Sequence, residues 1–156
     1  MRKNSGFTAF ELAISLAIMA IIASLILPPY LKWLRGHRLR GAVTNMMADL
    51  EMAKIRAIRE NALIAVQFCQ DRYTIFNEKD DVNYVCGTAG REVYRNRKLP
   101  AGVEIDMGNL TFADDRTRFN GRGLPVGFTV EQRIPVQNKT SSQEISVNRL
   151  GYMKVQ

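Results

Sequence analysis

The hydrophobic positions of the chain form three successive patterns, and the first is a nearly continuous apolar run. Between Phe7 and Leu31, 19 of 25 residues are apolar, and Glu11 carries the only formal charge. A helix over Phe7 to Leu27 would be about 31 Å long, which matches the hydrocarbon thickness of a bilayer. The run therefore predicts a helix over residues 7–31 that crosses a membrane once.

The second pattern is an apolar stripe at helical spacing, with charged residues such as Asp49 and Glu51 off the stripe. Its members are Leu39, Val43, Met46, Leu50, Ala53 and Ala57. The stripe predicts an amphipathic helix over residues 32–61 that packs by one face on the following domain and ends at Asn61. Pro28 and Pro29 lie between the two helical patterns, and they predict either a kink or the end of the first helix.

The third pattern consists of short runs rich in β-branched and aromatic residues, separated by turn residues. The expected strands are Leu63 to Cys69, Arg72 to Phe76, Glu92 to Arg95, Val103 to Asp106, Leu110 to Phe112, Arg116 to Phe119, Val126 to Gln132, Glu144 to Val147 and Tyr152 to Val155. Turns are expected at Asp80-Asp81 and over Gly87 to Gly90, among others. The fold class is α+β, with a strand-rich head carried on a helix.

Glu11 decides between the interpretations of the first run. A cleaved secretory signal is disfavoured because its apolar region is shorter than this one and Pro28-Pro29 follows the run. A plain anchor does not explain the carboxylate, since an unpaired charge in hydrocarbon costs at least several kcal/mol. Cleavage just before Phe7 would supply a partner, because it creates a free amine one helical turn away. The alternative is a Glu11 side chain that lies at the interface and reaches water.

The residues around Glu11 resemble the leader and first turn of a type IV pilin-like precursor. A leader with Arg2 and Lys3 ends at Gly6, Phe7 follows, and Glu11 stands four residues further on, before the apolar run. The resemblance implies that a prepilin peptidase cleaves after Gly6, that the new amine of Phe7 is methylated, and that Glu11 is the assembly carboxylate. Residues 1–6 are then the leader and residues 7–31 the transmembrane and assembly helix. In pilin-like proteins a proline near the end of the span also marks a segment that bends.

The order of motifs in the head resembles the GspH/FimT family of pseudopilins and minor pilins. These motifs are the end of the amphipathic helix, the strand from Leu63, the segment from Arg118 to Pro125, and the segment from Ile145 to Val155. The resemblance implies the pilin fold, in which a long N-terminal helix packs on an antiparallel β-rich head over residues 62–156.

The resemblance also implies a location and a set of partners. The chain is expected in the bacterial inner membrane as a single-pass protein with its head in the periplasm, incorporated into a pilus or pseudopilus. The partners would be other pilins or pseudopilins through their N-terminal helices, the prepilin peptidase and an inner-membrane assembly platform.

The positive-inside rule places the more basic flank of a membrane span in the cytoplasm. Four cations follow the apolar run and only Arg2 and Lys3 precede it, so this rule favours a cytoplasmic head, opposite to the orientation expected above. The far-side cations are Lys32, Arg35, Arg38 and Arg40. We give precedence to the leader, since its cleavage requires an N-terminus that faces a cytoplasmic peptidase. The four cations are then assigned to membrane lipid, as contacts to anionic headgroups.

The net charge of +7 over 156 residues by itself suggests a protein that binds nucleic acid, but the positions of the charged residues along the chain do not support this. Residues 1–6 carry two cations and residues 32–40 carry four, whereas residues 41–156 hold 16 basic against 14 acidic residues. DNA contacts are therefore confined to local positions. Some FimT-like relatives carry a basic Gly-Arg-x-Arg element near the C-terminus, and here Arg149 and Lys154 keep part of that character.

The two cysteines, Cys69 and Cys86, have 16 residues between them. In an oxidising periplasm, a disulfide that closes this loop would stabilise the fold by about 3 kcal/mol in the chain-entropy model. A zinc site is not expected, because no CxxC is present and His37 stands alone. Phosphate-loop, serine hydrolase and zinc protease motifs are absent from the sequence, so we expect no catalysis, no metal and no cofactor.

Two functions follow from these expectations. The first is a structural subunit, a minor pilin or pseudopilin that helps to initiate or cap a type IV pilus or a type II secretion pseudopilus. The alternative is a DNA-binding minor pilin at a filament tip that acts in DNA uptake.

Overall fold

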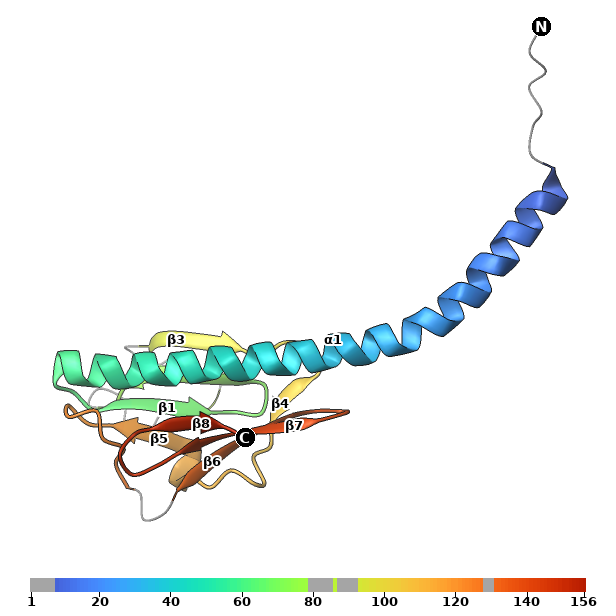
Figure 1. Ribbon diagram of the computed structural model, residues 1–156. Coiled ribbons are helices and arrows are strands. Elements are labelled where there is room, and N and C mark those ends of the chain that lie inside the picture. The colour runs from blue at the N-terminus through green and yellow to red at the C-terminus, as the bar shows by residue number, and fades with distance from the viewer. Residues whose placement is uncertain (1–7, 79–85, 87–92, 128–130) are drawn as a thin grey trace, which may run out of the picture. The chain divides into compact units, whose positions relative to one another are not determined.

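The computed structural model describes residues 8–78, 86, 93–127 and 131–156. The chain divides into two compact units, Met1–Leu34 and Arg35–Gln156. Among the described residues, one helix, α1 (Ala9–Glu60), precedes eight strands and a short 3-10 helix, η1 (Ala113–Asp115). The expected α+β order, with the helix first and the strands after it, is visible in Figure 1.

Helix α1 continues through Pro28 and Pro29, so these residues do not end it. Of the two expectations for these prolines, the end of the first helix is therefore wrong, since each proline removes one intrahelical hydrogen bond and the helix continues across both, whereas the kink stays a prediction. The helix ends at Asn61, as expected. Asn61 adopts φ 46°, and the Asn61 and Ala62 N–H groups donate to the carbonyls of Ile58 and Ala57. This is a Schellman cap with asparagine in the left-handed position.

The strands form two antiparallel four-stranded sheets. In the first sheet the order is β3 (Val93–Lys98), β2 (Arg72–Asn77), β1 (Ile64–Phe68) and β5 (Arg116–Phe119). In the second sheet the order is β4 (Val103–Ile105), β6 (Gln132–Asn138), β7 (Ser142–Val147) and β8 (Met153–Val155). Figure 1 shows the C-terminal half of α1 lying along β1 and β3.

The core of the head joins α1 to both sheets. Every residue of the expected stripe is buried: Leu39, Val43, Met46, Leu50, Ala53 and Ala57. They belong to one apolar cluster with side chains of the first sheet such as Val66 and Phe119, and of the second sheet such as Ile134 and Val147. The periodicity therefore identified the correct face of the helix.

One expected strand is absent, because Leu110 to Phe112 is irregular. The Asp106 carboxylate holds a turn just before it by accepting from the Gly108 N–H at 3.0 Å and from the Asn109 side chain at 2.7 Å. Thr111 bonds to β6 at Arg133, since its N–H donates to the Arg133 carbonyl and its Oγ1 accepts from the Arg133 N–H at 2.7 Å. A single backbone-to-backbone hydrogen bond does not make a strand ladder. The apolar side chain of Phe112 is nevertheless part of the core, since its ring packs on that of Phe68.

A second expected strand was placed too early along the chain. The prediction covered Val126 to Gln132, but β6 begins at Gln132 and contains Pro135. Residues 128–130 of that prediction, and the expected turns at Asp80-Asp81 and Gly87 to Gly90, lie outside the described residues. Pro135 is tolerated because its carbonyl accepts from the Asp106 N–H just past the end of β4. The ladder to β4 has already ended there, so the missing proline N–H costs no strand pairing.

Asp49 was expected off the apolar stripe, and this expectation is wrong, because its side chain is buried in the helix face that meets the first sheet. Its carboxylate accepts from the Tyr73 hydroxyl at 2.7 Å and from Arg95 Nη1 at 2.5 Å, and it forms an ion pair with Arg97, whose Nε lies 2.7 Å away. Burial and the Asp49 carboxylate raise the pKa of Tyr73, so its hydroxyl remains a donor. The carboxylate thus ties α1 to β2 and β3.

A second buried carboxylate, Glu78, ties β2 to β5 across the intervening strand. Glu78 Oε1 lies 3.1 Å from Arg116 Nη1 and 2.6 Å from Arg118 Nε. Charge-assisted hydrogen bonds of this kind are stronger than neutral ones. Together they fix the end of β2 against β5, on the residues directly before an undescribed segment.

The two cysteine residues are bonded to each other in the structure. Cys69 follows β1, and its Cα lies 5.9 Å from that of Cys86. The Cys69 N–H also donates to the Arg72 carbonyl, which closes the tight connection between β1 and β2. The disulfide therefore attaches Cys86 to a rigid part of the first sheet.

We expect Asp49→Ala to lower the free energy of unfolding by about 1–3 kcal/mol, because the buried Tyr73 hydroxyl loses its acceptor. Glu51→Ala is the matched control, since Glu51 lies two positions away and is half exposed. Urea unfolding of the full chain in detergent, followed by near-ultraviolet circular dichroism, measures the difference. Equal free energies for the two variants would contradict a stabilising role for Asp49.

We expect reduction of Cys69–Cys86 to lower the free energy of unfolding by about 3 kcal/mol, because the loop regains conformational freedom in the unfolded chain. The measurement is urea unfolding with and without a thiol reductant. A chain with both cysteines replaced by serine is the control and should not respond to the reductant. If the wild type is equally insensitive, the disulfide does not form in the protein.

Candidate assembly interface

The carboxylate of Glu11 lies in the first turn of α1 and closes a capping box with Thr8. The Thr8 N–H and hydroxyl both donate to Glu11 Oε2 at 2.9 Å, and the Glu11 N–H donates to Thr8 Oγ1 at 3.2 Å. This pattern satisfies N–H groups that a helix N-terminus otherwise leaves unpaired. Both hydrogen bonds from Thr8 to the Glu11 carboxylate end on Oε2, so Thr8 does not occupy Oε1.

The unit that contains Glu11 is apolar around the whole helix. Its large apolar side chains, such as Leu12, Met19 and Leu25, are exposed in the single chain. The polar groups within the run bond to the helix itself, since Ser15 Oγ donates to the Glu11 carbonyl and Ser24 Oγ to that of Ile21. By length and composition, α1 can cross a membrane. A helix that is apolar on all sides needs lipid or other helices around it.

Gly6 and Phe7, the expected cleavage and methylation sites, lie outside the described residues. Near the end of the apolar run, the rings of Tyr30 and Trp33 lie 6.1 Å apart. Aromatic residues are enriched where a span meets the membrane interface. In the second unit, Arg35, Arg38 and Arg40 are all exposed.

In the head, two turns approach the last turns of α1 very closely. Gly123 has φ 74°, and a Cβ there would lie 2.7 Å from Ile58 Cδ1. Gly151 has φ 73°, and a Cβ there would lie 2.9 Å from the Gly123 carbonyl oxygen. Lys54 Nζ donates to the Gly151 carbonyl at 2.8 Å. The Gly121 to Pro125 segment and the C-terminal turn are therefore held against the helix and against each other.

Of the two expected anion contacts, Arg149 lies on the turn that follows β7 and Lys154 lies in β8, opposite Ser146. Both side chains are exposed. Tyr152 lies between them and is also exposed, with Lys54 Nζ 5.9 Å from its ring centroid. The structure thus presents these cations at one end of the head, beside the end of α1.

A narrow groove runs beside the last turns of α1, lined by Met52, Ile55, Arg56 and Arg59. One wall is fixed by Glu60, which accepts from Arg56 Nε and from the Tyr94 hydroxyl, both at 2.7 Å. These two hydrogen bonds hold the pKa of Glu60 below its usual value. The carboxylate next to the groove therefore stays ionised and already has its partners.

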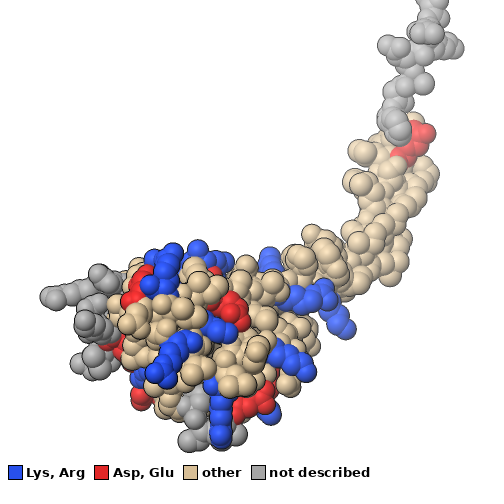
Figure 2. Space-filling view, turned by 60° about the vertical axis from the view of Figure 1, so that its left-hand side comes forward, with Lys and Arg blue, Asp and Glu red and all other residues tan. Residues whose placement is uncertain are grey.

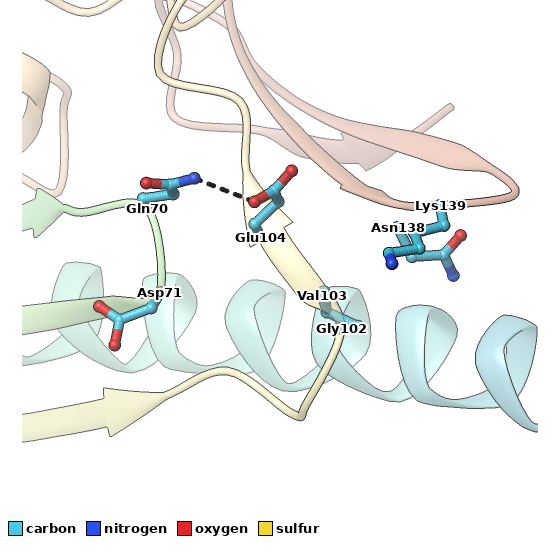
Figure 3. A pocket seen from close by; sticks show the side chains of 7 residues that line it. All are labelled: Gln70, Asp71, Gly102, Val103, Glu104, Asn138 and Lys139. Atoms are coloured by element: carbon cyan, nitrogen blue, oxygen red, sulfur yellow. Dashed lines mark hydrogen bonds between the residues drawn. The ribbon is translucent and has the colours of Figure 1, made fainter.

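A polar pocket of about 280 Å³ lies at another place on the head, between the β1–β2 connection, β4 and the β6–β7 turn. Figure 3 shows the Gln70 amide directed at Glu104, with Asn138 and Lys139 on the other side. Glu104 also accepts from Gln137, and Asp71 pairs with Arg72 at 2.9 Å, which lowers the pKa of Asp71. The two carboxylates of this pocket therefore have hydrogen-bond or ion-pair partners within the head, and Lys139 lines its other side.

The residues that the structure describes contain no group of three or more His, Cys, Asp or Glu side chains that could hold a metal ion. Basic and acidic side chains are interspersed over the face of the head seen in Figure 2. The described geometry therefore directs attention to surfaces that contact other macromolecules.

Sequence reasoning missed three residues that shape these surfaces: Thr8, Asp49 and Lys54. The Thr8 signal was present, since Thr followed three positions later by Glu is a capping box. Asp49 and Lys54 gave no local signal, because their partners lie in β3 and in the turn before β8, many residues further along the chain.

Residues 42–151 match the family model of the type II transport protein GspH. Among solved structures, the chain is similar to the type IV minor pilin FimU of Pseudomonas aeruginosa, with 14% identity and a TM-score of 0.59, over 77% of this chain and 89% of that one. It is also similar to the minor pseudopilin EpsH of the Vibrio cholerae Type 2 Secretion System, with 11% identity and a TM-score of 0.57, over 76% of this chain and 96% of that one.

No curated protein sequence matches the chain significantly. The family model nevertheless covers most of the chain, and it includes the end of α1, the first sheet and all of the second sheet except β8. The two structural likenesses show that the arrangement of helix and sheets is the pilin fold. The chain therefore belongs to the GspH family, and it has the pilin fold.

Proposed function

We propose that this chain is a minor pilin or pseudopilin that helps to initiate or cap a type IV pilus or a type II secretion pseudopilus. The observation that carries the proposal is the apolar run of α1, in which Glu11 is the one carboxylate and is held in the first turn, in a chain whose head has the pilin fold. The exposed apolar side chains of α1 need a bilayer before assembly and neighbouring helices after it. A chain of this build suits transfer from one apolar environment to the other.

Glu11 acts in that transfer as the assembly carboxylate. Cleavage after Gly6 frees the amine of Phe7, and methylation of the amine keeps its positive charge. Since Thr8 uses only Oε2, the Oε1 atom of Glu11 can accept from this amine or from that of a neighbouring subunit. Pairing is required because an isolated carboxylate in a helix bundle or in lipid is costly.

The surroundings of the chain follow from the same proposal. The prepilin peptidase and the assembly platform lie at the bacterial inner membrane, and the head lies in the periplasm, where the Cys69–Cys86 disulfide is stable. The exposed cations Arg35, Arg38 and Arg40, with Lys32, contact anionic lipid headgroups.

Pro28 and Pro29 give the span a place to bend. They cannot donate to the carbonyls of Ser24 and Leu25, so this turn of α1 has fewer hydrogen bonds than its neighbours. We propose that α1 kinks or locally unwinds here when a subunit leaves the bilayer for the filament. The turn then absorbs a change of helix direction at low cost.

DNA binding at a filament tip is the alternative function, and one observation favours it. Arg149 and Lys154 are exposed and flank Tyr152 along the chain, and the Tyr152 side chain is exposed as well. Cations beside an aromatic ring are a usual surface for single-stranded nucleic acid. The near balance of charges over residues 41–156 weighs against it.

We expect Glu11→Ala to leave the leader cleaved but to reduce incorporation into filaments severely, because the new amine of Phe7 loses its carboxylate partner. The measurement is the amount of the protein in the sheared filament fraction, together with the number of filaments per cell. Normal incorporation of Glu11→Ala would contradict the proposal.

The matched control is a Gly6 replacement, which should block cleavage and leave residues 1–6 on the chain. Terminal mass analysis separates the two defects, since Glu11→Ala should begin at Phe7 and the Gly6 variant at Met1. If the wild type also retains its leader, the processing step is wrong.

The DNA alternative predicts that the full chain in detergent retards duplex or single-stranded DNA at low salt. It further predicts that Arg149→Ala and Lys154→Ala each reduce the slope of the salt dependence by about one. Lys139→Ala, on an exposed turn elsewhere in the head, is the control. We expect no retardation by any of these proteins, and a clear shift would favour DNA binding instead.

A further inference from the structure

Large apolar side chains that are exposed in the described part of the head gather at one end. Leu150 is 64% exposed and Ile55 is 61% exposed; single exposed aliphatic residues are common, but several that lie together mark an interaction surface. We use the name Leu150 patch for the set Ile55, Ile58, Leu124, Leu150 and Tyr152, all of which are exposed.

The Leu150 patch is continuous because glycines bring its parts together. Ile58 packs on Gly123, next to Leu124, and Gly151 lies against the Gly123 carbonyl, between Leu150 and Tyr152. Lys54 joins the helix to the C-terminal turn through its bond to the Gly151 carbonyl. The groove beside Ile55 extends the same surface along the helix. The patch is therefore held in shape by backbone approach before any partner arrives.

The rim of the Leu150 patch carries positive charge. Arg59 follows Ile58 on the helix, Arg122 precedes Gly123, and Arg149 precedes Leu150, and all three are exposed. Lys154 lies two residues beyond Tyr152, on the same side of an extended segment. Glu60 bonds Arg56 and Tyr94 and also lies 3.7 Å from Arg59, so the positive charge of the rim that has no acidic partner among the described residues comes from Arg122, Arg149 and Lys154.

We propose that the Leu150 patch is the docking surface for the head of a different pilin-like subunit, whose facing surface is apolar with aspartate or glutamate at its rim. The inference rests on the proposed function, because it names the partner that the head would contact in a filament. An apolar centre with a charged rim is the usual anatomy of a protein interface. The cationic rim selects an acidic partner and steers its approach.

Two other occupants fit the surface less well. A second copy of this chain would bring two cationic rims together, and like charges across an interface are repulsive. Nucleic acid would use the cations but would leave Ile55, Ile58 and Leu150 without apolar contacts, whereas nucleic-acid interfaces are polar and wet. The aliphatic centre of the patch therefore favours an acidic protein surface.

The test places a photo-activatable phenylalanine analogue at Ile55 or Leu150 of the full chain in cells that assemble the filament. The matched control position is Lys139, which is exposed in the β6–β7 turn. That turn contacts α1 at Arg35, through Asn138 Nδ2, whereas the patch contacts it at Lys54, about 28 Å further along the helix. A partner seated on the patch should not reach both places equally.

We expect adducts from Ile55 and Leu150, and not from Lys139, with a second protein whose peptides identify it as a pilin-like subunit. Arg149→Glu should reduce the adduct by roughly tenfold, because it places an acid against an acidic rim. Lys139→Glu should leave it unchanged. Equal adducts from Lys139, adducts with a second copy of the chain, or adducts removed by nuclease would each overturn the proposal.

The same cells report on the proposed function separately. If Glu11-dependent incorporation into the filament fraction is normal while Ile55 and Leu150 give no adduct, the Leu150 patch is not the docking surface and the assembly function stands. If incorporation does not depend on Glu11, the assembly function itself fails, whatever the adducts show.

Discussion

The packing of one helical stripe onto two sheets is the constraint on which the head depends. The stripe includes small residues, Ala42, Ala53 and Ala57, so the backbone of α1 can approach both sheets, while Leu50 and Met46 fill the space between them. Asp49 lies within this face, and its carboxylate must find donors because burial without them is costly. Arg95, Arg97 and Tyr73 supply these donors, and they thereby fix the position of the first sheet along the helix. Apolar packing selects the face, and the buried charge selects the register.

Local patterns in the sequence were sufficient for the helix and for most strands. The stripe from Leu39 to Ala57 is visible because helical periodicity is a property of neighbouring residues, and Asn61 marks its end for the same reason. The position of β6 could not be found locally, since Pro135 argues against a strand and is accepted only because β4 is short. The burial of Asp49 was hidden for a related reason, because its partners on β3 follow 46 and 48 residues later.

The candidate site was predictable in its N-terminal half and not in its head. Glu11 is conspicuous as a lone charge in an apolar run, and Thr8 stands at the spacing of a capping box. The surface around Leu150 depends instead on three segments that are distant in sequence and meet through Gly123, Gly151 and Lys54. In the sequence Leu150 and Tyr152 look like ordinary members of a strand end, and only the fold shows that they are exposed beside Ile58. The pilin-like family could be recognised from motif order, whereas the Leu150 patch could be recognised only from the fold.

The capping box at the start of α1 also bears on the order of events at the N-terminus. The bonds between Thr8 and Glu11 involve no atom of residues 1–6, so loss of the leader leaves them in place. In the proposed function, the carboxylate is thus oriented while the chain is still a precursor, and cleavage after Gly6 would add a positive charge beside it without rebuilding the turn. The proposed maturation would then supply a counter-ion to an acceptor that is already in position, with little conformational entropy left to lose when the first contact between subunits forms.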